Sequence, residues 1–176
     1  MPATVTSGVV TLEFVAATAR GLKAYESALT VDTSATAFNA AMLMLGVDPA
    51  HARVPTRHFD PIPPAGDPVE IFVVPSRADA RPVRIEQLLF DKRTGSTLPP
   101  GPWVYTGSTF SRGQYMAEVD GVLIGFVHSP SPVIENPRAG AVNAYGDIIA
   151  NGTRVGLPGG AAVTLVVRAL PPEKRQ

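Results

Sequence analysis

The sequence contains no cysteine, which excludes disulfide bonds, thiolate metal sites and a cysteine nucleophile. Charged residues are scarce as well, at 17% of the chain against a usual share of about 25%. Lysine plus arginine equals aspartate plus glutamate, so the formal net charge is zero. A neutral chain lacks the basic footprint that nucleic acid or an anionic membrane requires, and little charge repulsion opposes docking onto a protein partner.

Long apolar runs are missing too. None approaches the roughly 20 residues of a membrane-spanning helix, so we predict no membrane span. The first ten residues, MPATVTSGVV, show no basic region followed by a long apolar stretch. No signal peptide is therefore predicted, although an export signal replaced by an initiator methionine would leave the same sequence.

Proline and glycine are abundant instead, with 18 and 16 residues of 176. They are not periodic and alternate with β-like segments, which indicates many turns rather than disorder. We see no internal repeat and no change of composition. We therefore predict a single domain over residues 1–176, with segments 1–7 and 171–176 fraying at its ends.

Most of the predicted elements are strands. Apolar, β-branched and alternating runs predict strands at 8–16, 22–32, 69–74, 82–90 and 162–169. The stretch 103–127 predicts three further strands in a meander. Its last turn would be Asp120-Gly121, a dipeptide typical of hairpins.

One segment predicts a helix, over residues 34–45. Residues suited to an N-cap precede it, Phe38, Ala41, Met42 and Leu45 recur at helical spacing, and Gly46 supplies a stop. Its almost wholly apolar surface predicts burial against a sheet. Proline-rich loops are expected at 47–67 and 128–140, and 141–150 fits either a short helix or an extended connection. The fold class is α+β: a mostly antiparallel β-sheet or sandwich with one buried α-helix near residues 34–45.

Two histidines lie in the long loop, with acidic residues nearby. Imidazole and carboxylate together can hold a transition metal. However, His51 and His58 are seven residues apart, which is not a recognised ligand spacing, and Arg53 and Arg57 between them would oppose a cation. Solvated loop residues are the better interpretation, and we assign no metal ligand and no cofactor.

Catalytic patterns are weak. His128 precedes Ser129 and Ser131, but the sequence lacks the Gly-x-Ser-x-Gly turn that exposes a serine nucleophile. Carboxylates that a glycosidase would need in a pair are present, but the sequence does not show their separation. These are Glu26, Asp120, Glu135 and Asp147. We assign no catalytic residue.

Six residues remain as candidates for contacting a ligand or partner: Tyr25, Glu26, Trp103, Tyr105, Asn136 and Asp147. Trp103 and Tyr105 could form a stacking surface beside the prolines, although core packing is the commoner role of such rings. For Glu26, an ion pair within the fold is the favoured alternative to a functional role.

Four segments resemble YdjY-like domain proteins in order and spacing, and together they span about residues 8–170. They are KAYESALTVDTSATAFNAAMLMLGVDP, PWVYTGSTF, VDGVLIGFVHSPSPVIENP and LPGGAAVTLVVRAL. The family's usual histidine is Tyr25 here, whereas its acidic partner remains as Glu26, so the metal or acid/base role of that pair loses support. The resemblance implies a bacterial, often exported, β-rich domain with no established biochemical role.

From these observations we expect a non-enzymatic binding or structural module of the bacterial cell envelope, as an accessory subunit of a larger protein assembly. The expected location is periplasmic or otherwise extracytoplasmic, with the cytoplasm as the alternative. The alternative function is a small-molecule or metal-binding enzyme that uses Glu26 and Tyr25 with the loop histidines.

Overall fold

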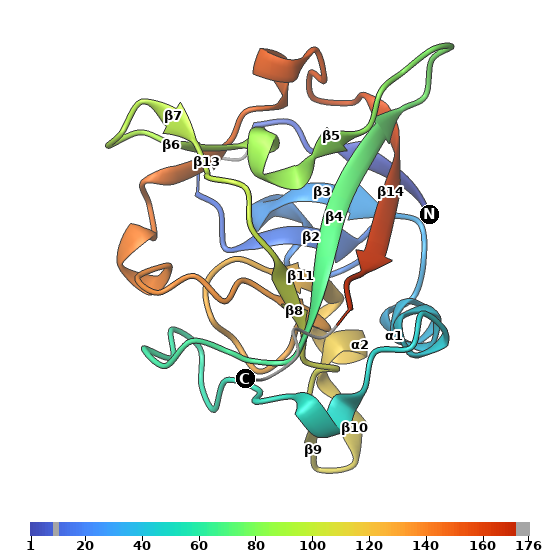
Figure 1. Cartoon of the computed structure of the whole chain (residues 1–176), viewed down its shortest axis with the longest axis vertical. Helices are drawn as coiled ribbons and strands as arrows, with labels where there is room; N and C mark the ends of the chain where they lie inside the picture. The colour runs from blue at the N-terminus through green and yellow to red at the C-terminus, as the bar shows by residue number, and fades with distance from the viewer. Residues whose placement is uncertain (9–10, 172–176) are drawn as a thin grey trace.

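The computed structural model describes residues 1–8 and 11–171. Eight strands form a closed barrel in the order β14-β1-β3-β2-β11-β12-β8-β4, and β4 returns to pair with β14 (Figure 1). Six neighbouring pairs are antiparallel, whereas β2–β3 and β11–β12 are parallel. The predicted β-rich class is therefore confirmed, but the sheet is closed and is neither an open sheet nor a sandwich. The barrel strands are β1 (Pro2–Val5), β2 (Phe14–Thr18), β3 (Ser27–Val31), β4 (Asp67–Pro75), β8 (Trp103–Tyr105), β11 (Val122–Gly125), β12 (Ile134–Glu135) and β14 (Ala162–Ala169).

Smaller elements surround the barrel. The short strand β5 pairs antiparallel with β4. A three-stranded sheet has the order β13-β6-β7, and β9 and β10 form a hairpin. These strands are β5 (Val83–Arg84), β6 (Leu89–Asp91), β7 (Ser96–Thr97), β9 (Phe110–Ser111), β10 (Gln114–Tyr115) and β13 (Ile148–Ala150). The 3-10 turns are η1 (Ala24–Glu26), η2 (Pro49–His51), η3 (Ile85–Leu88), η4 (Val142–Ala144) and η5 (Gly152–Val155).

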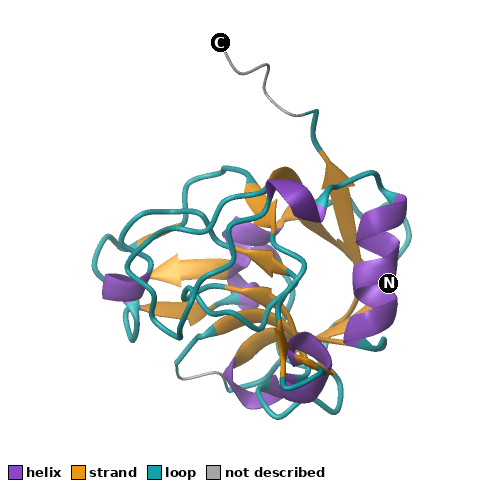
Figure 2. Cartoon of the chain, turned by 90° about the horizontal axis from the view of Figure 1, so that it is seen from below, coloured by secondary structure: helices purple, strands orange, loops and turns teal. Residues whose placement is uncertain are grey.

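The predicted helix is confirmed as α1 (Ala35–Met44). The Ser34 hydroxyl caps it by accepting a 3.1 Å hydrogen bond from the Ala37 amide. Only one face is buried, through Ala35, Phe38 and Met42, whereas the apolar side chains of residues 43–45 are exposed. The helix that the sequence predicted as buried is therefore buried on one face only. In Figure 2 α1 lies along the outside of the strands, and no helix among the described residues is long and apolar enough to cross a bilayer.

The predicted hairpin at Asp120-Gly121 was wrong. A second helix, α2 (Met116–Asp120), occupies that segment, and Gly121 ends it with φ +67°. A glycine in the left-handed conformation is common both at a helix C-terminus and in a hairpin turn. The Asp-Gly dipeptide alone therefore does not distinguish a helix end from a hairpin. The Glu118 carboxylate then joins the helices by accepting a 2.8 Å hydrogen bond from the Thr36 amide.

Several other predicted element boundaries differ from the observed ones. Segment 1–7, expected to fray, contributes β1, which pairs with both β14 and β3. The strand predicted at 8–16 begins only at Phe14, and its residues 9–10 lie outside the described chain. The strand predicted at 22–32 shortens to β3 behind η1, and the one at 82–90 breaks into β5, η3 and β6. Segment 141–150 holds both η4 and β13, whereas β14 matches its predicted range.

A carboxylic acid is buried in the barrel wall at the end of β12. Glu135 is wholly inaccessible, and one of its oxygens accepts a 3.1 Å hydrogen bond from the Ser129 amide. Gly125 lies against it, because a Cβ there would come within 2.6 Å of the Glu135 Oε2. No hydrogen-bond donor reaches that oxygen from the residues that the structure describes. Burial raises the pKa of Glu135 well above its ordinary value of 4.5.

We expect Glu135 to make the protein less stable as pH rises. Below pH 4.5 the carboxyl is protonated in both states, but above it only the unfolded state ionises. The unfolded state then binds fewer protons, so wild type should lose about 1.4 kcal/mol of unfolding free energy per pH unit until the folded pKa is reached. Urea unfolding of wild type and Glu135→Gln at several pH values measures this. A difference between the two proteins that does not change with pH would contradict the assignment.

Candidate functional site

Four charged or titratable side chains meet beside the start of β2. The Lys23 ammonium lies 2.9 Å from Glu26 Oε2 and 3.4 Å from Glu13 Oε2. His58, from the long loop 47–67, brings its Nε2 to 3.5 Å from the same Glu13 oxygen. We call these four residues the Glu13 cluster. It joins three separate stretches of chain around two carboxylates.

Backbone hydrogen bonds hold Glu13 in place. Its amide donates to the Glu26 carbonyl at 3.1 Å, which ties the start of β2 to η1. Its carbonyl accepts from the amides of Phe126 and Val127, at 3.0 and 3.1 Å, directly after β11. The Glu13 side chain is therefore positioned by the barrel wall and is almost fully buried.

Aromatic rings surround the cluster. His58 stacks on Phe14 with ring centroids 6.3 Å apart and meets Phe59 edge-on at 4.3 Å. Phe59 in turn contacts Tyr145 at 5.0 Å. The Lys23 ammonium lies 6.0 Å from the ring centroids of both Phe14 and Tyr25. Charged groups and rings thus form one continuous feature, which extends from the buried Glu13 and Phe14 to the exposed Tyr25 and Tyr145.

The cluster favours full ionisation of the Lys23–Glu26 pair. The hydrogen bond to Glu26 raises the pKa of Lys23. Burial acts to raise the pKa of Glu26, but hydrogen bonds from Lys23 and Tyr25 outweigh it and lower that pKa overall. The interaction with Glu26 raises the pKa of Tyr25. The pKa of Tyr145 is raised mainly by burial, and to a smaller extent by the charges of Glu13 and Glu26. Both phenols therefore remain protonated at neutral pH.

Two of the six candidates from the sequence, Tyr25 and Glu26, lie in or beside this cluster. Sequence reasoning missed Glu13 and Lys23, and it treated His58 as a solvated loop residue. The (i, i+3) spacing of Lys23 and Glu26 was the one available signal. Glu13 and His58 gave none, because the fold alone brings them to η1.

The loop histidines do not act together. His51 Nδ1 lies 2.6 Å from Asp67 Oδ1, whereas His58 contacts Glu13. Among residues 1–8 and 11–171, no group of three or more histidine, aspartate or glutamate side chains is arranged to hold a metal ion. His128 is buried, and its Nδ1 lies 2.7 Å from the Asp60 carbonyl oxygen. The Ser131 hydroxyl donates to Asp120 and not to an imidazole.

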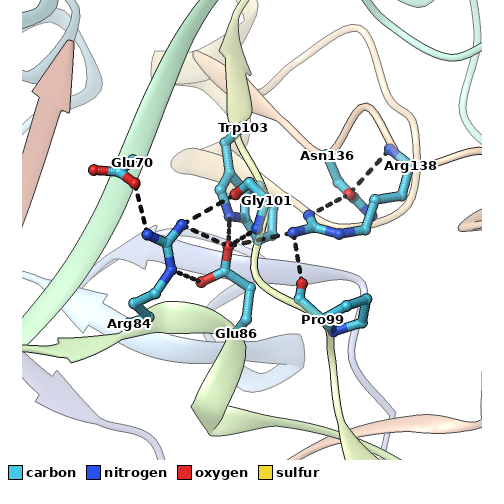
Figure 3. A network of polar contacts seen from close by, with 8 residues as sticks. All are labelled: Glu70, Arg84, Glu86, Pro99, Gly101, Trp103, Asn136 and Arg138. Carbon is cyan, nitrogen blue, oxygen red and sulfur yellow. Dashed lines mark hydrogen bonds and ion pairs between the residues drawn. The ribbon is translucent and has the colours of Figure 1, made fainter. Parts of the chain in front are cut away.

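Trp103 and Asn136 belong to a different feature, the buried network of Figure 3. Glu86 is its centre, and its Oε1 accepts hydrogen bonds of 3.2 Å from both Trp103 Nε1 and Arg138 Nη2. Asn136 orients Arg138 by accepting a 3.0 Å hydrogen bond from Nη1. Arg84 completes the network, because its Nε lies 3.3 Å from Glu86 Oε2. Glu86 thus draws η3 inward and interrupts the strand predicted there.

The remaining candidates, Tyr105 and Asp147, lie away from the Glu13 cluster. Tyr105 is buried and donates a 2.8 Å hydrogen bond to Asn39 Oδ1 on α1. With Trp103 also buried, the stacking surface considered from the sequence does not exist. Asp147 lies 3.3 Å from Arg93, beside the three-stranded sheet. Only the Glu13 cluster combines charge with exposed aromatic rings among the features that these candidates mark.

Removing the Glu86 carboxylate should destabilise the fold strongly. Glu86→Ala leaves two arginines and the indole N–H without their buried acceptor, which costs about 3–5 kcal/mol for a broken buried pair. The matched control is Glu70→Ala, because Glu70 also contacts Arg84 but its side chain is 26% exposed, against 1% for Glu86, so its removal should cost clearly less. Urea denaturation at pH 7 compares them, and equal losses in both variants would refute a central role for Glu86.

No curated protein gives a significant match. No solved structure gives one either. The YdjY domain matches residues 3–168, which is nearly the whole chain and includes every residue of the Glu13 cluster. The chain therefore belongs to the YdjY domain family.

Proposed function

We propose that the protein is a non-enzymatic binding module of the bacterial cell envelope, an accessory subunit of a larger protein assembly. Its partner-binding surface is the Glu13 cluster with the side chains exposed around it. One observation carries the proposal: Leu22, Tyr25 and Tyr145 are 71%, 66% and 45% exposed beside charges that are already paired.

This arrangement resembles the energetic centre of a protein interface. Leu22 and Tyr25 flank Lys23 in the chain, and Tyr145 reaches the cluster through Phe59. Tyrosine is enriched among the residues that dominate binding energy, because it buries a large rigid surface and keeps a polar end. Because Leu22, Tyr25 and Tyr145 are the exposed side chains around the Glu13 cluster, we call these three residues the rim of the cluster, or the rim. A protein partner covering the rim would remove apolar surface from water without leaving the cluster's charges unpaired.

The contacts within the cluster favour binding over catalysis. Both glutamates are engaged by Lys23, and His58 contacts a carboxylate rather than a hydroxyl that it could activate. The envelope location draws its support from the often exported proteins that the chain resembles. The neutral net charge agrees with docking on protein rather than on nucleic acid.

One contact favours the alternative, a small-molecule or metal-binding enzyme. His58 Nε2 lies 3.5 Å from Glu13 Oε2, in the cluster that also contains Glu26 and borders Tyr25. Imidazole beside carboxylate is a general-base arrangement. Metal analysis of wild type and Glu26→Gln decides whether this alternative replaces the binding module. Stoichiometric metal that disappears in the variant would favour the enzyme.

The absence of cysteine allows a clean crosslinking test of the proposed surface. We expect Asn143→Cys, carrying a maleimide photocrosslinker two residues from Tyr145, to give one discrete adduct in the bacterial envelope fraction. Ser111→Cys, in β9 and exposed, should give none. Adding Tyr25→Ser should reduce the adduct about tenfold or more, as for loss of an interface anchor.

Phe110→Ser is the matched control, because Phe110 is 71% exposed and lies outside the rim. It should leave the adduct unchanged. Equal adducts at residues 143 and 111, or equal effects of Tyr25→Ser and Phe110→Ser, would reject the rim as the partner surface. A labelled protein found only in the soluble cytoplasm would reject the envelope location.

A further inference from the structure

The ammonium of Lys23 occupies a site with the chemistry of a cation receptor. Two carboxylate oxygens, from Glu13 and Glu26, lie 3.4 and 2.9 Å from it. Two ring centroids, of Phe14 and Tyr25, lie 6.0 Å from it. Carboxylates supply charge-assisted hydrogen bonds, and ring faces attract the same cation through their quadrupoles. The four groups come from two stretches of chain, residues 13–14 and 25–26, and meet at one ammonium.

The receptor groups are held more firmly than their occupant. The side chains of Glu13 and Glu26 are only 8% and 19% exposed, against 35% for Lys23. Backbone hydrogen bonds fix Glu13 to η1 on one side and to the end of β11 on the other. Lys23, in contrast, reaches the carboxylates through a flexible four-carbon stem. Lys23 is the most exposed of the three side chains, so its ammonium is the group that an incoming cation can reach and replace.

Without Lys23 the carboxyl groups of Glu13 and Glu26 would lie near each other with no lysine ammonium between them. Glu13 and Glu26 would then share the space with His58, the aromatic rings and the Tyr145 hydroxyl. The rim also leaves an approach open, because Leu22 and Tyr25 project into solvent on both sides of Lys23 in the chain. A cationic side chain arriving from outside would find the carboxylates and rings that now surround Lys23.

We propose that the Glu13 cluster binds a lysine or arginine side chain of the protein partner, and that Lys23 is an internal occupant which this side chain displaces. The proposal rests on the proposed function, since it names the partner group that the same surface recognises. Lys23 then has two effects. Before binding it pairs with both carboxylates. Only a cation that binds these carboxylates more strongly than Lys23 does can then replace it.

The test uses purified protein and a small probe, Nα-acetyl-lysine N-methylamide, followed by amide and aromatic NMR shifts. Lys23→Met removes the ammonium and keeps an apolar stem. We expect this variant to bind the probe about fivefold or more tightly than wild type, the effect of removing one competing ion pair. The shifts should map to Glu13, Tyr25 and Phe14. Nα-acetyl-arginine N-methylamide should give the same pattern.

Three controls make the result specific. Lys92→Met, the same substitution at an exposed lysine in the β6–β7 turn, should bind the probe as wild type does. The neutral probe Nα-acetyl-norleucine N-methylamide should not bind Lys23→Met. Glu26→Gln added to Lys23→Met should abolish the gain. Unchanged affinity in Lys23→Met, or equal binding of the neutral probe, would overturn the proposal, and the amide spectrum of each variant verifies its fold.

This titration separates the inference from the proposed function, because it requires no partner. Tight probe binding by Lys23→Met without any specific crosslink at residue 143 would reject the partner surface and support the cation site. A specific crosslink that depends on Tyr25, with no gain of probe binding in Lys23→Met, would support the surface and reject the cation site.

Discussion

Strands β4 and β14 pair antiparallel over seven residues, from Val163 opposite Pro75 to Ala169 opposite Val69. Alternate side chains of β4, at positions 69, 71 and 73, are fully buried, and β14 contributes Val163 and Leu165. This ladder turns a twisted sheet into a barrel, since it joins the last strand of the chain to one formed much earlier. Closure removes the free edges that an open sheet of these strands would present to other chains.

The closed wall also positions the Glu13 cluster. Glu13 directly precedes β2. Its backbone hydrogen-bonds to η1 on one side and to the residues after β11 on the other, and this holds its side chain at the barrel wall. The loop 47–67 crosses from α1 to β4 and brings His58 onto Phe14. The cluster is thus an outcome of tertiary structure, in contrast to the Glu86 network, which serves the interior. The charged groups of this chain are few, and most of the described ion pairs lie at these two places.

Local signals in the sequence were enough for the elements that depend on local physics. The serine cap and apolar spacing of α1, and the β-branched run of β14, predicted both elements. The same kind of signal failed at Gly121, because a helix C-terminus and a hairpin turn both require a left-handed residue. It also failed at residues 82–90, where the buried Glu86 lies in a 3-10 turn that interrupts the alternating pattern of a strand. Tyr25 and Glu26 were identified through a motif, but Glu13 and His58 were not. Their contact depends on the path of a long proline-rich loop that no local rule describes.

The order of strands around the barrel has a consequence for biosynthesis. Strands β1 and β4 both border β14, yet residues 162–169 leave the ribosome after every other barrel strand has been made. A nascent chain therefore remains an incomplete sheet with two unpaired edges until β14 has been made. Contacts this distant in sequence slow folding and lengthen the period in which such edges are accessible. A chaperone that shields extended segments would have its main opportunity during this interval.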